Sequence, residues 1–308
     1  MKWTKDGTAV IGIDHGYGNI KTANTVTQTG LLSSASQPTF EGNILYYDGS
    51  YYTLGEGHKA FIPDKTQDND FFIFTLMGIA KELRRENLTE ADVYLAVGLP
   101  LTWVRAQRDV FRAYLTANEQ VSFIFNQTEY RIRVVGCKVY PQGYAAVIDR
   151  LPEMTGVNML ADIGNGTLNI MYLENRKALE SKCWTEKLGT EQCAIRLSNA
   201  ALDRFGKSLY PGLVQSLLRT GKAGIAQPYL DVLQPILRSY CDEVFTVLRK
   251  YEYDPDMMHL YISGGGSRVI EHSGSYDPTR VTLITDICAA AKGYEFLAVK
   301  QIGRERNG

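Results

Sequence analysis

The sequence predicts a duplicated α/β fold, and the prediction depends on a repeated motif and on where its copies lie. The pattern aspartate-x-glycine-x-glycine occurs as Asp14-His15-Gly16-Tyr17-Gly18 and again as Asp162-Ile163-Gly164-Asn165-Gly166. Each copy follows a short apolar run and precedes a segment with the residue pattern of a strand. The aspartates, at positions 14 and 162, are 148 positions apart, which is about half of the 308-residue chain. One glycine-rich hairpin is therefore expected in each half.

Strand and helix patterns alternate along the first half. Asp48-Gly49-Ser50 is a good hairpin turn between two short strands. The expected strands are Val10–Asp14, Asn19–Thr27, Asn43–Tyr47, Tyr51–Leu54, Val93–Val97, Val121–Phe125 and Tyr130–Val139. Helices are expected where Phe72, Leu76, Ile79 and Leu83 recur with helical spacing, and over Trp103–Ala117.

The second half repeats this plan after a helix predicted over Pro141–Arg150, because proline is favoured in a first helical turn. The expected strands are Val157–Asp162, Thr167–Leu173, Leu260–Ser263 and Val281–Ile284. Helices are expected over Thr190–Phe205, from about Tyr229 to Tyr251, and from a cap at Asp286 to about Lys300.

Composition excludes several classes of protein. With 44% hydrophobic and 22% charged residues, the chain has a globular composition and is long enough for two domains. The net charge of -1 argues against a general attraction to DNA or to a membrane surface. No stretch approaches the roughly 20 apolar residues that a membrane span needs. The five cysteines form no CxxC pair, so buried thiols and a cytoplasmic location are expected.

The repeated motif has a chemical interpretation. Glycines in a tight turn allow positive φ and leave room for backbone N–H groups to surround an anion such as phosphate. An aspartate repels phosphate, but it can hold the hydration shell of a magnesium ion that bridges the phosphates. The motif therefore predicts phosphate and Mg²⁺ together.

Other candidates are weaker or fail. Lys21 could reach the phosphates or be an exposed lysine on an edge strand, and the sequence leaves both open. Gly206-Lys207-Ser208 lacks the earlier glycine of a Walker A loop, because position 201 is Ala201. The triple glycine that ends at Gly266 lacks the last glycine of the dinucleotide-binding pattern, because position 269 is Val269.

Three further motifs carry a resemblance to a known family: Val139–Gln142 (Val-Tyr-Pro-Gln), Ile262–Ser267 (Ile-Ser-Gly-Gly-Gly-Ser) and Ala291–Tyr294 (Ala-Lys-Gly-Tyr). With both glycine turns in this order, the chain resembles the actin-like ATPases, and among them the bacterial ParM/StbA plasmid-segregation proteins. The resemblance implies an actin-like (ribonuclease H-like) duplicated fold whose two domains flank a nucleotide cleft. Domain I would span 1–145 with an inserted subdomain at about 31–92, and domain II 146–285 with one at about 180–255. Residues 286–308 would form a hinge and a return helix that packs on domain I.

The resemblance also implies site residues. Phosphates would be bound by Asp14, Gly16, Tyr17, Gly18, Asn19 and Lys21 and by Gly164, Asn165, Gly166 and Thr167. Adenosine would be bound by Gly189, Thr190, Gly264, Gly265, Gly266 and Ser267, and Mg²⁺ by Asp14 and Asp162, mainly through water. The catalytic pair would be Gln142 and Asp162. Several relatives carry glutamate where this chain has Gln142, so we expect Gln142 to orient water by hydrogen bonds rather than to accept a proton.

The implied function is an ATPase that polymerises with ATP, disassembles after hydrolysis and acts in plasmid segregation. Its ligands would be ATP or ADP and Mg²⁺. Its partners would be further copies of itself, head to tail, and an adaptor protein bound to a plasmid centromere-like site, with no direct nucleic-acid or membrane contact. Two alternatives stay open: a small-molecule (sugar-type) kinase of the same superfamily, and a scaffold that binds nucleotide without turnover.

Overall fold

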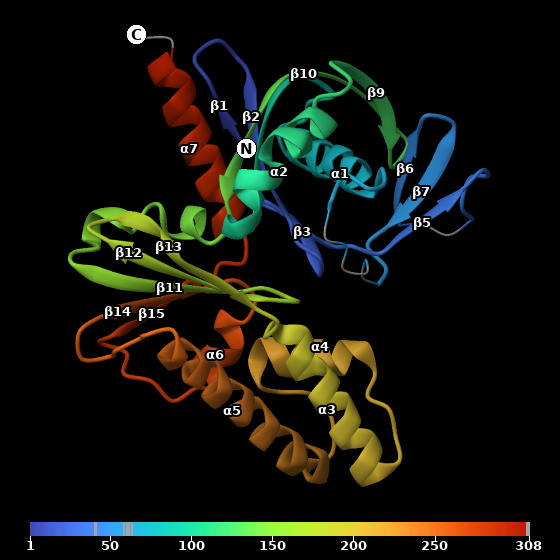
Figure 1. Ribbon diagram of the computed structural model, residues 1–308. Helices are drawn as coiled ribbons and strands as arrows, with labels where there is room; N and C mark the ends of the chain where they lie inside the picture. The colour runs from blue at the N-terminus through green and yellow to red at the C-terminus, as the bar shows by residue number, and fades with distance from the viewer. Residues whose placement is uncertain (40–41, 58, 60–61, 63, 306–308) are drawn as a thin grey trace. The chain divides into compact units, whose positions relative to one another are not determined.

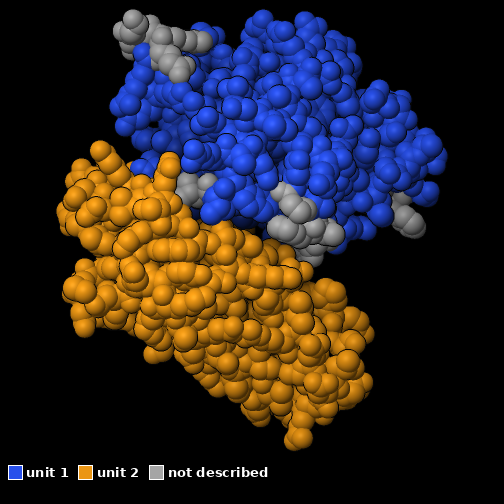
Figure 2. Space-filling view, viewed as in Figure 1, with its two compact units in different colours: residues 1–148, 288–308 blue, residues 149–287 orange. Residues whose placement is uncertain are grey.

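The computed structural model describes residues 1–39, 42–57, 59, 62 and 64–305, and it has an α/β fold with two sheets (Figure 1). The chain divides into two compact units (Figure 2). Unit 1 consists of residues 1–148 and 288–308, and unit 2 of residues 149–287. Each unit is built around its own sheet, and each glycine-rich turn belongs to a different unit.

Unit 1 contains a sheet with the strand order β4-β3-β2-β8-β10-β9-β6-β7-β5, with β1 also paired to β2. Strands β2, β8 and β10 are parallel, so their carboxyl ends lie at the same end of the sheet. The strands are β1 Lys2–Trp3, β2 Ala9–His15, β3 Asn19–Thr22, β4 Val26–Gln28, β5 Leu31–Ser34, β6 Asn43–Tyr47, β7 Ser50–Leu54, β8 Glu90–Leu99, β9 Gln120–Phe125 and β10 Thr128–Pro141.

Helices cover both faces of this sheet. Because side chains alternate along a strand, Ile11 and Ile13 of β2 enter the core with α1 (Asp70–Arg85), whereas Val10 enters the core with α7 (Ala289–Glu305). The helix α2 (Leu101–Leu115) adds Phe111 and Leu115 to the α1 side. The sheet is therefore buried on both sides, as parallel strands require.

Glycines let α7 lie close to the sheet. A Cβ at Gly12 would lie 2.0 Å from the Ala291 carbonyl oxygen, and one at Gly98 would lie 2.0 Å from the Tyr294 hydroxyl. These close approaches explain why both strand positions are glycine.

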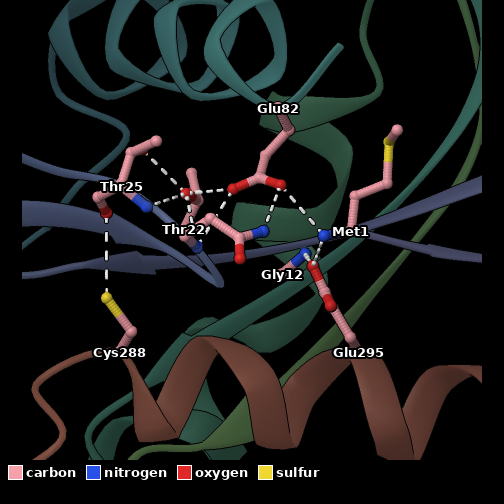
Figure 3. A network of polar contacts seen from close by, with 8 residues as sticks. Met1, Gly12, Thr22, Thr25, Glu82, Cys288 and Glu295 are labelled. Atoms are coloured by element: carbon pink, nitrogen blue, oxygen red, sulfur yellow. Dashed lines mark hydrogen bonds and ion pairs between the residues drawn. The ribbon is translucent and has the colours of Figure 1, made fainter. Parts of the chain in front are cut away.

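A buried polar cluster fills a gap along one edge of β2 (Figure 3). Strand β1 pairs with the start of β2 and β3 pairs with its end, and between them the Gly12 N–H donates to Glu295 Oε1 at 3.0 Å. The Met1 ammonium lies 2.9 Å from Glu82 Oε2 and 3.2 Å from Glu295 Oε1. Glu82 also accepts hydrogen bonds from Thr22 and Asn24. The cluster ties α1 and α7 to the edge of β2.

Unit 2 contains a sheet with the order β13-β12-β11-β14-β15, in which β11, β14 and β15 are parallel. Its core includes an apolar stripe of α5, formed by Leu233, Leu237, Tyr240 and Val244, together with Leu197 of α3. The strands are β11 Val157–Ile163, β12 Leu168–Glu174, β13 Lys177–Glu186, β14 His259–Ser263 and β15 Val281–Leu283, and the helices are α3 Thr190–Phe205, α4 Pro211–Thr220, α5 Gln227–Lys250 and α6 Ser267–Ser273.

The structure corrects several sequence expectations. The predicted helix over Pro141–Arg150 is wrong, because β10 runs to Pro141 and only the short 3₁₀ helices Tyr144–Val147 and Leu151–Glu153 follow. The last helix begins at Ala289 rather than directly after Asp286. The single strand expected over Asn19–Thr27 is two strands, because the Thr22 backbone N–H bonds the Thr25 carbonyl in a turn. The elements β1, β5, β13, α4 and α6 were not expected.

None of the helices within the described residues has the length and apolar character needed to cross a membrane. The cysteines are free thiols, and all of them are buried except the half-buried Cys183.

Candidate functional site

The first glycine turn joins β2 to β3 in unit 1. Asp14 lies next to the end of β2 and is almost fully buried, at 7% exposure. A Cβ at Gly16 would lie 2.8 Å from the Asn19 carbonyl oxygen, so the close approach of the turn to itself requires glycine there. The expected positive φ is wrong for Gly16, whose backbone lies outside that region.

Two predicted site residues converge on Asp14. Lys21 Nζ donates to Asp14 Oδ2 at 2.9 Å, and the antiparallel register of β2 and β3 places these residues opposite each other. Gln142 Nε2 donates to Asp14 Oδ1 at 2.9 Å. Gln142 directly follows β10, and its own N–H donates to the Leu99 carbonyl at the end of β8. The three side chains therefore meet at the carboxyl ends of parallel strands, which is where α/β sheets bind ligands.

The charges around Asp14 keep it ionised. Burial by itself raises the pKa of this carboxyl group, but the charge and hydrogen bond of Lys21, together with the charge of Lys65, hold the pKa below its ordinary value. An ionised carboxylate only accepts hydrogen bonds, so Gln142 must present its NH₂ group to Asp14. The carbonyl oxygen of the Gln142 amide is then directed elsewhere and can accept a hydrogen bond from water.

Two buried residues at this turn had no role predicted from the sequence: His15, inside the motif, and Lys65, far from it in the chain. Lys65, only 1% exposed, donates from Nζ to the His15 carbonyl oxygen. His15 is fully buried, and its Nε2 lies 2.7 Å from the Thr75 hydroxyl. Burial, followed by the charge of Lys65, lowers the pKa of His15 to about 3, so its imidazole is neutral. No local signal identifies Lys65, which lies 51 positions beyond Asp14 in a polar segment.

Tyr17 and Asn19 complete the first turn. The Tyr17 hydroxyl donates to the Ile62 carbonyl oxygen, and its ring makes an edge contact with Phe71 at 6.1 Å between centroids. The Tyr17 side chain therefore anchors the turn to unit 1. Asn19 begins β3.

The second glycine turn joins β11 to β12 in unit 2. Its backbone is closed by a hydrogen bond from the Gly164 N–H to the Thr167 carbonyl oxygen at 2.9 Å. Asp162, next to the end of β11, accepts a hydrogen bond at Oδ1 from the Ser263 hydroxyl at 2.9 Å. Ser263 ends β14, and the parallel register pairs these two residues. This serine belongs to the motif Ile-Ser-Gly-Gly-Gly, in which a binding role was predicted only from Gly264 onwards.

The start of α3 lies against the second turn. The Thr190 N–H donates to the Gly164 carbonyl at 3.0 Å, and the Glu191 N–H donates to the Asn165 carbonyl at 2.8 Å. A Cβ at Gly189 would lie 2.2 Å from the Asn165 carbonyl oxygen. The structure thus brings the predicted phosphate-side turn and the predicted ribose-side residues of unit 2 together.

The triple glycine follows β14 and crosses the end of β11. Gly264 has φ +81°, and its Cβ would lie 2.5 Å from the Ile163 carbonyl oxygen. A Cβ at Gly266 would lie 2.2 Å from the Ile163 side chain, whereas one at Gly265 would meet no atom within 4 Å. The Ser267 hydroxyl donates to the Gly264 carbonyl at 2.8 Å. The fold therefore explains Gly264 and Gly266 but not Gly265.

The aspartates of the two glycine-rich motifs fit a magnesium ion only if that ion arrives together with phosphates. Within the described part of the chain, no three histidine, cysteine or acidic side chains gather closely enough to hold a metal ion by themselves. Mg²⁺ usually keeps several waters and binds through one or two carboxylates together with substrate phosphates. The ionised Asp14 fits an ion that arrives with phosphates, and it does not fit a resident metal site.

Two α/β units, each with a glycine-rich hairpin and an aspartate at the end of a parallel strand, define an actin-like fold. Residues 12–144 match the family model of the N-terminal domain of actin-like proteins. No curated protein matches the sequence. The resemblance to actin-like proteins and the predicted actin-like α/β fold are confirmed, while the nucleotide cleft and the inserted subdomains stay predictions.

Solved structures give the same fold. The archaeal actin homologue Ta0583 matches with a TM-score of 0.76 and 18% identity over 95% of this chain and 100% of that one, and it has also been solved in complex with ADP. ParM of Bacillus thuringiensis with ATP has a TM-score of 0.71 and 14% identity, covering 96% of this chain and 100% of that chain. The Alp12 filament has a TM-score of 0.70 and 15% identity, covering 96% and 99%.

Proposed function

We propose that this protein is a filament-forming ATPase that binds ATP with Mg²⁺ and polymerises while the nucleotide is intact. One observation carries the proposal: Asp14, Lys21 and Gln142 bring a carboxylate, an ammonium and an amide together at the carboxyl ends of parallel strands. They do so in a fold whose solved examples include proteins with bound ADP and ATP. The meeting of the two glycine turns on one nucleotide stays a prediction.

The first turn has the chemistry of a phosphate and magnesium site. The residues proposed to bind phosphate there are Asp14, Gly16, Tyr17, Gly18, Asn19 and Lys21, and in the second turn Gly164, Asn165, Gly166 and Thr167. Lys21 donates a hydrogen bond to Asp14. Because a lysine is a flexible point charge, it can turn from the carboxylate to a phosphate oxygen when ATP enters. Asp14 then remains ionised to orient the waters around Mg²⁺, which neutralises phosphate charge.

Gln142 and Asp162 are the proposed catalytic residues. The Gln142 carbonyl oxygen would accept a hydrogen bond from the attacking water, and Asp162, held by Ser263, would help to polarise that water. Neither residue needs to take part in covalent chemistry, because phosphoryl transfer depends mainly on positioning and on stabilisation of charge. Gly189, Thr190 and Gly264 to Ser267 are proposed to bind adenosine.

Polymerisation is proposed to be head to tail. Such contacts generate an open helical filament when the rotation between subunits does not close a ring. Hydrolysis would then weaken the filament. We further propose that the filament segregates plasmid DNA in the cytoplasm through an adaptor protein, and the net charge of -1 favours such an indirect link over direct DNA binding.

Light scattering and phosphate release, measured together on the purified chain with ATP and Mg²⁺, test the proposal. We expect scattering to rise when ATP is added and to fall as phosphate appears, with filaments visible by electron microscopy. Binding of ATP without turnover would favour the scaffold alternative, and phosphorylation of added sugars would favour the kinase. An absence of any ATP binding would overturn the proposal.

A further inference from the structure

A lysine outside both glycine turns lies underneath the first one. Lys65 belongs to the segment before α1, and its side chain is 1% exposed. Its Nζ donates a hydrogen bond to the carbonyl oxygen of His15, the residue between Asp14 and Gly16. The same nitrogen lies 5.3 Å from the ring centroids of both Tyr17 and Phe71.

A buried lysine requires a compensating role, because removing an ammonium from water is unfavourable unless other groups replace the lost hydration. Here the His15 carbonyl, two aromatic faces and the charge of Asp14 provide that replacement. Burial lowers the pKa of Lys65 to about 8, and the charge of Asp14 acts in the opposite direction. Lys65 therefore keeps its ammonium charge at neutral pH, although burying an apolar side chain at this position would cost less free energy.

The bond to His15 fixes the direction of a neighbouring backbone group. The peptide that joins His15 to Gly16 is planar and trans, so the His15 carbonyl and the Gly16 N–H point in opposite directions. Lys65 holds the carbonyl toward the interior of unit 1. The Gly16 N–H therefore points away from the interior, the direction from which an anion would approach the turn.

We propose that Lys65 is a positioning residue of the first phosphate turn. Its side chain holds the peptide between His15 and Gly16 in the orientation that phosphate binding requires. This inference rests on the proposed function. The turn is held at two further points by the same part of the chain, since Tyr17 bonds the Ile62 carbonyl and the Lys59 N–H donates to the Thr29 hydroxyl, which itself bonds the Tyr17 carbonyl. Among these contacts, Lys65 is the one that bonds the motif through a charged group, at the carbonyl of the peptide that joins His15 to Gly16.

The test compares ligands with and without phosphates on the full chain. In Lys65→Met we expect the affinity for ATP and ADP to fall at least tenfold, about 1.4 kcal/mol, while the affinity for adenosine stays within twofold of wild type. Lys65→Arg, which keeps a charged donor, should bind ATP within threefold of wild type. The matched control is Lys81→Met, because Lys81 is also a partly buried lysine of unit 1 but donates to Thr27, away from the motif.

The outcomes separate this inference from the proposed function. Wild-type protein that does not bind ATP would refute the proposed function itself. Wild-type binding with unchanged ATP affinity in Lys65→Met, or with an equal loss for ATP and adenosine, would refute only the role of Lys65. If Lys65→Met does not fold in a thermal unfolding test, Lys65→Gln replaces it, and the same comparison of ATP with adenosine decides.

Discussion

Gln142 Nε2 donates a hydrogen bond to Asp14 Oδ1 over 2.9 Å, although the two residues are 128 positions apart. The contact exists because β8 lies between β2 and β10 in a parallel arrangement, so the ends of the outer strands come together beside it. Since the ionised Asp14 only accepts hydrogen bonds, the contact also fixes which end of the amide faces it. Asp14 thus fixes the orientation of the Gln142 amide.

Removing the Gln142 amide should slow hydrolysis more than it weakens binding. We expect Gln142→Ala to bind ATP within threefold of wild type and to release phosphate at least tenfold more slowly, a loss of about 1.4 kcal/mol of transition-state stabilisation. Phosphate release after a single turnover measures this rate directly. Gln215→Ala, a change of an exposed glutamine on α4, is the control. Wild-type turnover in Gln142→Ala would exclude the positioning of water by Gln142.

Removing the Lys21 charge should lower the stability of the protein more at pH 7 than at pH 5. In wild type, the lowered pKa of Asp14 means that its contribution to stability is present above its ordinary value of 3.8 and is lost as the pH falls through the lower folded value. Without Lys21, burial is less opposed and the folded pKa of Asp14 rises. We therefore expect Lys21→Met to be destabilised relative to wild type at pH 7 and less so at pH 5, because Asp14 then takes up a proton.

Denaturant unfolding at the two pH values measures this difference. Lys182→Met removes an exposed lysine that pairs with Glu252, and it should change stability little at either pH. An equal loss for Lys21→Met at both pH values would show that Lys21 does not control the ionisation of Asp14.

The sequence predicted the parts of the site that have local signals. Both glycine hairpins are found where the motif indicates, and α3 was predicted with its observed bounds, Thr190–Phe205. Helix α4 was missed although Leu213, Val214, Leu217 and Leu218 have helical spacing, so that signal was present and unused. Lys65 could not be predicted, because a lone lysine in a polar segment has the pattern of a solvated residue and only the tertiary fold brings it under His15.

The position of Gln142 shows a second limit of predicting structure from the sequence. Proline at 141 indicated the start of a helix, but the parallel pairing of β10 with β8 continues to Pro141, opposite Leu99. Tertiary pairing therefore overrides the local preference of proline. Gln142 follows a strand and does not begin a helix, and its role at the site stays a prediction.

Asp162 is expected to act on the hydrolysis step. Asp162→Ala should leave ATP binding and assembly largely intact and should slow phosphate release at least tenfold, about 1.4 kcal/mol. Ser263→Ala removes the hydroxyl that holds Asp162 Oδ1 and should slow release in the same direction by a smaller factor. Asp256→Ala, at an exposed position, is the control. Unchanged turnover in Asp162→Ala would show that the second carboxylate is not catalytic.

The triple glycine allows structural and ligand roles to be separated. Gly264→Ala should destabilise the fold, because φ is +81° and the added Cβ would lie 2.5 Å from the Ile163 carbonyl oxygen. Gly265→Ala should unfold at nearly the wild-type temperature, since its Cβ would meet no atom within 4 Å. If adenosine lies against this turn, Gly265→Ala should nevertheless weaken both ATP and adenosine binding. Wild-type affinity for both ligands would place the adenosine elsewhere.

The buried cluster around Glu82 should contribute strongly to the stability of unit 1 (Figure 3). Burial by itself raises the pKa of Glu82, but hydrogen bonds from Thr22, the Met1 ammonium and Asn24 outweigh it and lower the pKa. Removing the carboxylate takes this acceptor from the buried Thr22 hydroxyl and leaves Glu295 as the only carboxylate, among the described residues, beside the buried Met1 ammonium, so Glu82→Ala should reduce the free energy of unfolding by about 3 kcal/mol.

The pH dependence of the Glu82 effect follows from the direction of its pKa shift. Because the folded pKa is lowered, the contribution of Glu82 is present above its ordinary value of 4.5 and disappears as the pH falls through the folded value. The difference between wild type and Glu82→Ala in denaturant unfolding should therefore be full at pH 7 and smaller below pH 4. Glu129→Ala, which removes an exposed partner of Arg131, should have little effect at either pH. A loss below about 1 kcal/mol for Glu82→Ala at pH 7 would mean that the cluster does not fasten α1 to the edge of β2.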